Sequence, residues 1–399
     1  MMITDGDSAA GRLHCLVNRL RSLVSAEGGQ LMAVLEEASV PPSATLIAKL
    51  RSRWDEELVA AALQQAALRR RAAEKYSKAD KMFFTQEGLE QASSEVVARH
   101  RAEQFAARSR GVILDLCCGI GGDLAFLAEH GEVAGVDYDV SRIACARLNA
   151  EVYGVQDRVR LAVADVQKIR IDDGHSVFID PSRREAGHRR GPDWYQPSLG
   201  WCYQLAERAA LVAVKAAPGI ERDLVPEGWG IEFVAVGRAL KEAVLWSPSS
   251  GAAGRKASVL PGDAHLLAVP GDLVDVRPPG AYLLDPSPAV TRAELVEDLA
   301  RTLDVWKIDS RIAFLSGDSP TPTPFGRWLR ITDSLPWNVK NLRKALRARG
   351  IGRVDIRRRG LAGDVEQIGG SLGLRGGEKA TLVMTRVEDR PWAFICADV

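Results

Sequence analysis

Four short, mainly apolar runs occur between residues 112 and 179, and an acidic residue follows each of them within two positions. The runs cover residues 112–114, 133–136, 159–163 and 176–179. Continuous apolar runs of this length are typical of parallel strands that are buried on both faces. Between the first two runs, apolar residues from Leu124 onward follow helical spacing. The alternation predicts an α/β sheet whose strands lead into Asp115, Asp137, Asp165 and Asp180.

Three more mainly apolar runs follow, at residues 211–215, 231–236 and 242–246, each with one charged residue. The last two are close enough in sequence to form a hairpin-like pair. With the first four runs they make seven predicted strands.

The rest of the chain divides by pattern. Residues 1–80 follow helical spacing. Ser, Gly, Ala and Pro interrupt the stretches 247–262 and 270–279, which indicates a boundary or a β-excursion. We interpret the Asp-Pro-Ser at Asp285 as a turn entering a helix, and the Pro-rich run 319–324 as an extended connector. The predicted parts are a helical region (1–80), a catalytic domain (81–260, core 111–250), a connecting region (261–324) and a small C-terminal α/β domain (325–399).

Composition narrows the class of protein. The chain has 399 residues, a net charge of +1 and 46% apolar residues, which suits a globular protein of several domains. Its six cysteines form no CxxC pair, so we expect reduced thiols and no metal site. The same cysteine usage favours a cytoplasmic protein. Charged residues interrupt the N-terminal apolar positions, and we therefore expect neither a signal peptide nor a membrane span.

The turn after the first strand, Asp115-Leu-Cys-Cys-Gly-Ile-Gly-Gly-Asp123, contains the candidate chemistry. Glycines between a strand and a helix allow a ligand to approach the backbone at the helix N-terminus. No Gly-Lys-Ser/Thr follows, which argues against a triphosphate loop. Leu124 stands where a dinucleotide fingerprint needs its third glycine. Asp115 would repel phosphate, but it could accept a hydrogen bond from an ammonium group.

Together these signals resemble the class I S-adenosylmethionine-dependent methyltransferases over roughly residues 85–250. The resemblance implies a Rossmann-like α/β sheet of seven strands, the last of them antiparallel. The resemblance implies that S-adenosylmethionine is the cofactor and that Asp137 binds its ribose. Tyr138 would pack on the adenine, with Asp165 and Val166 at its edge. Gln91 and Ser93, with Phe84, would belong to a lid before the first strand. The methionine half would contact Asp115, Cys117, Gly119, Gly121 and Gly122, where Cys117 replaces the usual glycine of the family.

The same resemblance places the acceptor at Asp180, Pro181, Ser182 and Arg183. Methyltransferases that modify base nitrogens have a second proline and an aromatic residue where Ser182 and Arg183 stand. Enzymes that methylate a pyrimidine carbon need a cysteine nucleophile, and Lys215-Ala-Ala-Pro occupies its place after the fifth strand. We therefore expect Asp180 and the Pro181 carbonyl to orient a nitrogen, and Arg183 to hold phosphate or the lid. A loop rich in Arg, with Trp194 and Tyr195, follows and suits base stacking.

Positive charge gathers near the C-terminus. Between Lys340 and Arg359 there are nine basic residues and one acid, although the chain as a whole is nearly neutral. A helix, a basic strand and a closing strand over about residues 325–399 resemble the RNA-binding module called THUMP. The predicted RNA-binding residues are Lys340, Arg343, Lys344, Arg347, Arg357, Arg358 and Arg359.

Three functions fit this sequence. The first is an RNA methyltransferase that modifies a base nitrogen in tRNA or rRNA. The second is a methyltransferase of a small molecule or a protein, in which the C-terminal domain mediates assembly. The third is a non-catalytic RNA-binding protein. The target nucleotide, the methylated atom and the oligomeric state do not follow from the sequence.

Overall fold

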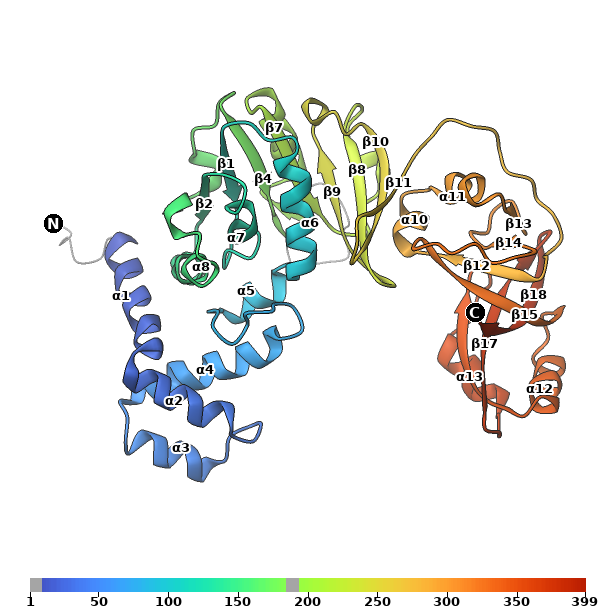
Figure 1. Ribbon diagram of the computed structural model, residues 1–399, viewed down its shortest axis with the longest axis horizontal. Helices are drawn as coiled ribbons and strands as arrows, with labels where there is room; N and C mark the ends of the chain where they lie inside the picture. The colour runs from blue at the N-terminus through green and yellow to red at the C-terminus, as the bar shows by residue number, and fades with distance from the viewer. Residues whose placement is uncertain (1–8, 184–193) are drawn as a thin grey trace. The chain divides into compact units, whose positions relative to one another are not determined.

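The computed structural model describes residues 9–183 and 194–399 (Figure 1). These residues divide into two units. The first unit comprises Met1–Gly230 with Ala243–Ala253, and the second comprises Ile231–Glu242 with Gly254–Val399. Among the described residues, no helix combines the length and apolar character that crossing a bilayer requires.

The first unit begins with helices, as the apolar spacing predicts. Side chains cap three of them: Ser25, Ser43 and Asp55 each accept a hydrogen bond from a backbone N–H of the first turn. Their apolar faces form a core that includes Leu31, Leu35 and Val59. The helices are α1 (Ala9–Arg21), α2 (Ala26–Glu36), α3 (Ala44–Arg51) and α4 (Glu56–Ala72).

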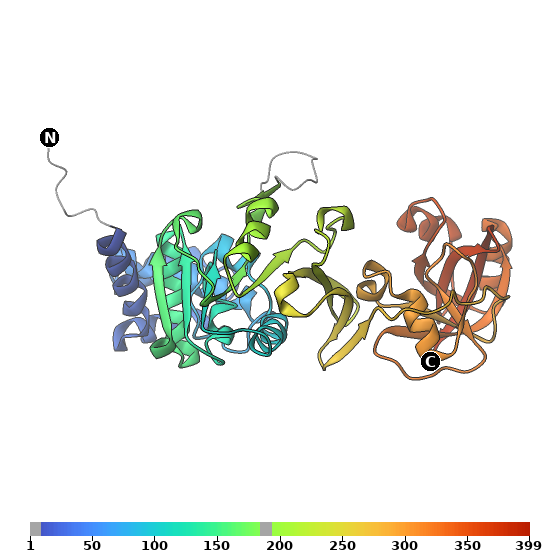
Figure 2. The same ribbon diagram turned by 90° about the horizontal axis from the view of Figure 1, so that it is seen from above.

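A nine-stranded sheet follows, in the order β11-β10-β8-β9-β7-β4-β1-β2-β3. β1, β2, β3, β4 and β7 pair in parallel, with β1 between β2 and β4 (Figures 1 and 2). The strands are β1 (Val112–Leu116), β2 (Val133–Asp137), β3 (Val159–Val163), β4 (His175–Ile179), β7 (Leu211–Ala216), β8 (Gly230–Val236), β9 (Ala239–Trp246), β10 (Gly254–Leu260) and β11 (Ala264–Leu267).

The seven predicted strands form an uninterrupted run, β8-β9-β7-β4-β1-β2-β3, and the last of them in sequence, β9, is antiparallel to β7. β10 and β11 extend this sheet beyond the seven strands. Small and polar residues dominate the stretch 247–262, for which a boundary or a β-excursion is expected, and strand β10 shows that it is a β-excursion. Its apolar end, Ala257 to Leu260, is nevertheless buried, and this burial explains why the segment forms a strand.

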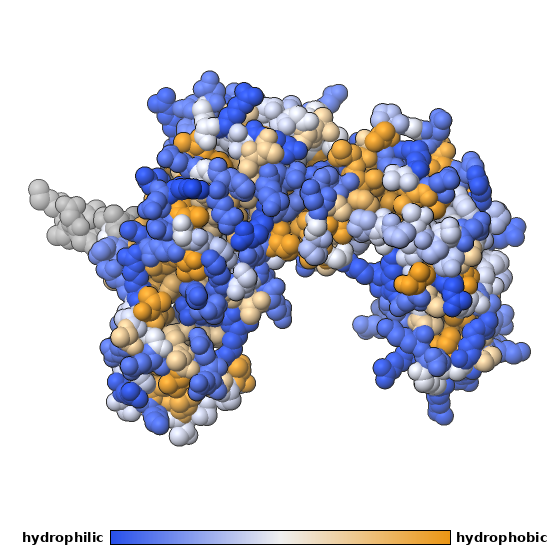
Figure 3. Space-filling view, viewed as in Figure 1, coloured by the Kyte–Doolittle hydropathy of each residue, from blue (hydrophilic) through white to orange (hydrophobic). Residues whose placement is uncertain are grey.

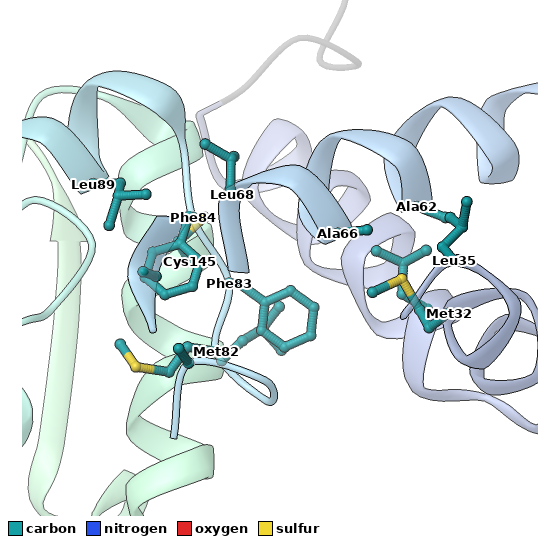
Figure 4. Packing of buried hydrophobic residues seen from close by; sticks show 14 of the residues in the cluster. Met32, Leu35, Ala62, Ala66, Leu68, Met82, Phe83, Phe84, Leu89 and Cys145 are labelled. Atoms are coloured by element: carbon teal, nitrogen blue, oxygen red, sulfur yellow. The ribbon is translucent and has the colours of Figure 1, made fainter. Parts of the chain in front are cut away.

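Helices α5 (Gln86–Gln91), α6 (Glu95–Ala106), α7 (Leu124–Leu127) and α8 (Val140–Tyr153) complete the first unit. The segment around Phe83, Phe84 and Leu89 packs between α4 and Cys145 of α8 (Figure 4). The N-terminal helices therefore share one apolar core with the helices that lie beside the sheet. Short elements lie after β4: β5 (Ser182–Arg183), β6 (Tyr195–Gln196) and α9 (Leu199–Gln204).

The second unit contains a seven-stranded sheet in the order β13-β14-β12-β15-β18-β17-β16. One of its cores packs Leu342 and Leu346 against Leu382 and Ile395, and a second core contains Leu283, Phe314 and Phe394. The elements are β12 (Tyr282–Pro286), α10 (Pro288–Arg292), α11 (Val296–Leu303), β13 (Trp306–Lys307), β14 (Leu315–Gly317), β15 (Gly326–Pro336), α12 (Val339–Ala348), β16 (Ile351–Arg358), α13 (Val365–Leu372), β17 (Glu378–Val387) and β18 (Arg390–Asp398).

This sheet differs from the expectation for residues 261–324. The segment interpreted there as a turn entering a helix is strand β12, which pairs with β15 through Leu283 and Leu329. α10 does follow, with Ser287 as its N-cap. The apolar run before Asp285 covers only residues 281–284, between Gly280 and the Asp-Pro-Ser turn signal. Its strand character therefore depends on burial by β14 and β15, which local sequence does not display.

Candidate active site

The turn after β1 adopts the backbone of a glycine-rich ligand loop, including at the position where the sequence has cysteine. Cys117 has φ 60°, a left-handed conformation that costs about 1–2 kcal/mol for a residue with a Cβ. Gly119 has φ 55°, and a Cβ built on it would meet no atom within 4 Å. The backbone at Gly119 therefore faces open space that a ligand can occupy.

The other two glycines of the turn are required by packing. A Cβ on Gly121 would lie 3.1 Å from Ala146 of α8, and one on Gly122 would lie 2.5 Å from the Tyr76 hydroxyl. Tyr76 belongs to the segment that follows the N-terminal helices, and its hydroxyl donates to the Ser93 carbonyl (2.8 Å). The N-terminal part of the chain therefore contacts the turn directly.

Asp115 is the most unusual group of this region. It is 1% exposed, and neither carboxylate oxygen accepts a hydrogen bond from any described residue. Burial raises the pKa of this carboxyl well above its usual range, and the neighbouring carboxylates of Asp123 and Asp180 raise it further. A buried ionised carboxylate without a donor is unfavourable, and a cationic ligand group would relieve that cost.

Asp137, at the end of the neighbouring strand, is buried but well supported. Its Oδ2 accepts from the Gly119 amide (3.0 Å) and its Oδ1 from the Asp139 amide (2.9 Å). Burial raises its pKa, although these two hydrogen bonds act in the opposite direction. The bond to Gly119 fixes the glycine turn to β2, and each oxygen keeps a second lone pair for a ligand hydroxyl.

The predicted adenine-side residues follow β2 and β3 at the same edge of the sheet. Tyr138 is 69% exposed, with the Arg142 guanidinium 5.9 Å from its ring centre. Asp165 is exposed and caps a short helical turn by accepting from the Gln167 amide (3.0 Å). Val166 is buried behind it. Because β2 and β3 are parallel, these residues lie beyond paired strand ends.

The predicted lid residues have three different surroundings. Phe84 is 1% exposed and belongs to the apolar core, with its backbone bonded to the Gln65 side chain. The Ser93 hydroxyl accepts from Arg101 (3.0 Å), which also forms a buried ion pair with Asp123. Gln91 is exposed at the end of α5. α5 itself packs on the turn, because a Cβ on Gly88 would lie 2.4 Å from Ile120.

Asp180 directly follows β4, and its amide donates to the Leu116 carbonyl of β1 (3.2 Å). Its Oδ2 accepts from Lys215 Nζ at 2.6 Å. Pro181 is buried, and the Ser182 hydroxyl donates to the Gln196 carbonyl (3.3 Å). The carboxylate of Asp180 thus lies at the carboxyl end of the parallel strands, where open α/β sheets bind their ligands.

Arg183 is exposed, and its guanidinium lies 5.5 Å from the centre of the Trp194 ring. Trp194 in turn contacts Tyr195 edge to face, with ring centroids 5.5 Å apart. The Tyr195 hydroxyl accepts from the Ala217 amide (3.0 Å), so this hairpin is attached to the end of β7. The remainder of the predicted arginine-rich loop, residues 184–193, lies outside the described residues.

Sequence reasoning missed two contributors to this region. Lys215 on β7 reaches Asp180, and the only sequence signal was its position at the end of an apolar run. Asn149 of α8 is fully buried and joins two segments: its Oδ1 accepts from the Phe83 amide, and its Nδ2 donates to the Phe83 and Ile120 carbonyls. A lone asparagine inside a helix gives no signal of this role.

Comparisons with known proteins now bear on this geometry. The chain is 36% identical over 340 residues to an uncharacterized S-adenosylmethionine-dependent methyltransferase of Mycobacterium tuberculosis, covering 82% of this chain and 92% of that protein. The chain belongs to the S-adenosylmethionine-dependent methyltransferases. S-adenosylmethionine is therefore the cofactor of this enzyme.

Family models divide the methyltransferase into three matched stretches. Residues 110–249 match the RNA cap guanine-N2 methyltransferase family, and residues 326–398 match the THUMP domain-like family. Residues 17–72 match a domain of unknown function. The predicted methyltransferase resemblance and the THUMP-like resemblance are both confirmed.

Two further similarities differ in how much of the chain they cover. The methyltransferase is 33% identical over 114 residues to the 23S rRNA (uracil(1939)-C(5))-methyltransferase of Acidithiobacillus ferrooxidans, covering 27% of this chain and 26% of that protein. A crystal structure of a putative methyltransferase from Porphyromonas gingivalis aligns with a TM-score of 0.71 at 14% identity, over 100% of this chain and 99% of the other. At that identity the structural likeness shows a shared fold.

The basic residues of the THUMP-like domain fall into two groups. Lys340 and Lys344 of α12 are exposed, on a surface that is mainly hydrophilic in Figure 3. Arg343 donates to the Ser371 carbonyl and Arg347 to the Gly373 carbonyl (2.8 Å), so both also stabilise the end of α13.

The arginines at the end of β16 are more engaged with the protein. Arg357 pairs with Asp355 (2.9 Å), and Arg358 donates to the Leu361 carbonyl (2.9 Å). Arg359 is bound to the Asp285 carboxylate (2.8 Å). A charge count along the sequence treats all of these cations as equal, but their contacts differ.

Proposed function

We propose that this methyltransferase modifies a base nitrogen in RNA, either tRNA or rRNA. The observation that carries the proposal is Asp180, whose carboxylate follows β4 with one oxygen bound to Lys215. No described residue donates to its other oxygen, Oδ1. An amino group of a base can donate there, and this contact would orient its lone pair toward a methyl donor.

The cofactor site proposed for this enzyme rests on the strand ends. Bound S-adenosylmethionine supplies an electrophilic methyl group. Asp115 would accept from its ammonium group and Asp137 from its ribose, and the lone carboxylate of Asp115 supports this orientation. The methionine half would be bordered by the turn residues Cys117, Gly119, Gly121 and Gly122. The adenine would be bordered by Tyr138, Asp165 and Val166. Gln91 and Ser93 would belong to the segment that covers the cofactor.

A nitrogen acceptor is favoured over a pyrimidine carbon by the state of the cysteines. Methylation at carbon needs a thiolate nucleophile. Burial raises the pKa of Cys117 well above its usual range and that of Cys202 to about 12. Neither thiol supplies a thiolate at neutral pH, although the Acidithiobacillus relative acts on a uracil carbon. The match to a guanine-N2 methyltransferase family supports the nitrogen.

RNA is the proposed partner because a THUMP-like domain and a basic helix occur in the same chain as the catalytic sheet. Lys340 and Lys344 would contact phosphates from the exposed side of α12. Four arginines would border that surface: Arg343, Arg347, Arg357 and Arg358. Their contacts within the protein use only some of the N–H groups of each guanidinium, and the other N–H groups would bind RNA. Arg359 would contribute mainly charge, since three groups of the protein already bind its guanidinium.

The test is mass spectrometry of nucleosides from total RNA of a strain that lacks the protein. We expect one methylated nucleoside to be missing, and to return when the wild-type chain is expressed. The Asp180→Asn variant should form the methylated nucleoside about 10²–10⁴-fold more slowly than the wild type, because an amide accepts protons poorly. Asp173→Asn, an exposed acid of the same unit, is the control.

An unchanged nucleoside profile in the deletion strain would contradict RNA as the substrate. Full restoration by Asp180→Asn would contradict the role of Asp180. Methylation that appears in protein or in small molecules of the complemented strain would instead favour the second function considered for this sequence.

A further inference from the structure

We propose that Lys215 is a positioning residue that holds the acceptor carboxylate and the segment above the cofactor turn in one fixed arrangement. The proposal rests on the proposed function, because it deepens the role given to Asp180. Lys215 was not among the residues assigned to the site from the sequence.

The first support is strand register. β4 pairs in parallel with β7, and Ile179 is opposite Val214. The next residues of the two strands are Asp180 and Lys215, so their side chains leave the sheet at neighbouring positions. Lys215 Nζ lies 2.6 Å from Asp180 Oδ2, a charge-assisted hydrogen bond between side chains that are 15% and 27% exposed.

The second support is a further contact of the same ammonium group. Lys215 Nζ also lies 3.5 Å from the backbone carbonyl of Gln91, 124 positions earlier in the chain. Gln91 ends α5, and α5 packs through Gly88 on Ile120 of the cofactor turn. One side chain therefore joins the end of β4 to the segment that covers the turn.

The geometry suits a lysine for this task. An ammonium group has three donors and no acceptor, so it can bind a carboxylate and a carbonyl together. The bond to Oδ2 fixes the plane of the Asp180 carboxylate and leaves Oδ1 for the acceptor. A carboxylate that rotated freely would present its oxygen in the productive direction only part of the time.

This arrangement also sets the position of the acceptor base relative to the methyl donor. In the transfer, the bond from the base nitrogen to the methyl carbon forms while the sulfur–methyl bond breaks. The electron pair of that bond goes to sulfur, and the nitrogen then loses its proton to solvent or to Asp180. Lys215 takes no part in these bonds; it keeps the accepting oxygen at a fixed distance from the segment that covers the cofactor.

The experiment compares Lys215→Met and Lys215→Arg with Lys241→Met, an exposed lysine of β9, in the full-length chain. The acceptor is total RNA from the deletion strain, and the methyl donor is isotope-labelled S-adenosylmethionine. We expect Lys215→Met to lower kcat about 10²-fold with an unchanged KM for S-adenosylmethionine. Lys215→Arg, which keeps a cation and several donors, should recover most of that loss, and Lys241→Met should equal the wild type.

A second measurement needs no RNA. Hydrogen exchange of the amides in residues 86–92 is followed with S-adenosylhomocysteine bound. Loss of the Gln91 contact should speed this exchange in Lys215→Met, but not in Lys241→Met. If the wild type methylates no RNA, the proposed function fails while the exchange result still decides the role of Lys215.

Two results would overturn the inference. The first is wild-type exchange of residues 86–92 in Lys215→Met. The second is a fall in S-adenosylhomocysteine affinity and in melting temperature that accompanies the fall in kcat of Lys215→Met. A lysine with a purely structural role would lower all three quantities together.

Discussion

Two strands of this enzyme lead into the same tripeptide, Asp-Pro-Ser, with different results. After β4, the Asp180 carboxylate is 27% exposed and binds one lysine. In β12 of the second unit, the Asp285 carboxylate is 7% exposed and binds two arginines, Arg238 and Arg359, both at 2.8 Å. The same tripeptide therefore carries a partly exposed acid with one cationic partner in one place and a buried acid with two in the other, and the role proposed for Asp180 rests on this difference.

The largest expected effect comes from removing the second of these acids. Asp285→Asn leaves two guanidinium groups without their counter-ion, and we expect the second unit to lose about 3 kcal/mol of stability. Calorimetry should show a lower unfolding temperature for that unit, with unchanged affinity for S-adenosylmethionine. A variant that keeps its unfolding temperature but loses cofactor affinity would reverse the roles assigned to the two regions.

Asp115 extends the comparison to an acid with no donor at all. We expect Asp115→Asn to weaken S-adenosylmethionine binding about 10–100-fold, because a hydrogen bond to an ionised group is lost. The unfolding free energy without cofactor should not fall, since the carboxylate has no hydrogen bond from the described residues. Calorimetric titration and chemical denaturation measure the two quantities, with Asp173→Asn as control. Equal loss of both would assign Asp115 to the folded core.

The pH dependence of Asp115 follows from its raised pKa. Between the unfolded value of about 3.9 and the folded value, the native state binds more protons than the unfolded state. The contribution of Asp115 to stability therefore increases as pH falls through the folded pKa, and it is complete below the unfolded pKa. Cofactor affinity should change in the opposite sense, rising with pH. Both trends should disappear in the difference between the wild type and Asp115→Asn.

A smaller effect is expected on RNA affinity. Reversing Lys340 and Lys344 to Glu should weaken RNA binding about tenfold and reduce its salt dependence, because both side chains are exposed. The control is the double variant Lys49→Glu and Lys241→Glu, which changes the net charge by the same amount elsewhere on the protein. Filter binding at several salt concentrations distinguishes the pairs. If both pairs weaken binding equally, net charge accounts for the affinity and α12 is not an interface.

The smallest effect concerns the turn itself. Cys117→Gly removes the strain of a left-handed conformation, about 1–2 kcal/mol, from the folded state. It also gives the unfolded chain more conformational freedom, which destabilises the folded state by about 0.5–1 kcal/mol. We expect a net stabilisation of about 0.5–1 kcal/mol with unchanged cofactor affinity. Thermal unfolding with and without S-adenosylhomocysteine checks it. A destabilised variant would mean that packing of the Cys117 thiol outweighs its backbone strain.

The sequence predicted the parts of the fold that local patterns encode. Buried strands such as Val112–Leu116 produce continuous apolar runs, and α12 shows its apolar and basic faces in its spacing. Strand β12 was missed because its burial depends on strands far away in sequence. The contact between Lys215 and Asp180 was missed for a related reason: it follows only once β4 and β7 are known to be neighbours.

The contact between Tyr76 and the glycine turn has a practical consequence for anyone who engineers this enzyme. The Rossmann-like portion is often treated as a module that can be cut out and transplanted. A fragment that contained only residues 110–249 would lack the Tyr76 hydroxyl beside Gly122, the α5 surface that packs on Ile120, and Phe83, which binds Asn149. The helices at the start of the chain should therefore travel with the sheet in any chimera or minimal version.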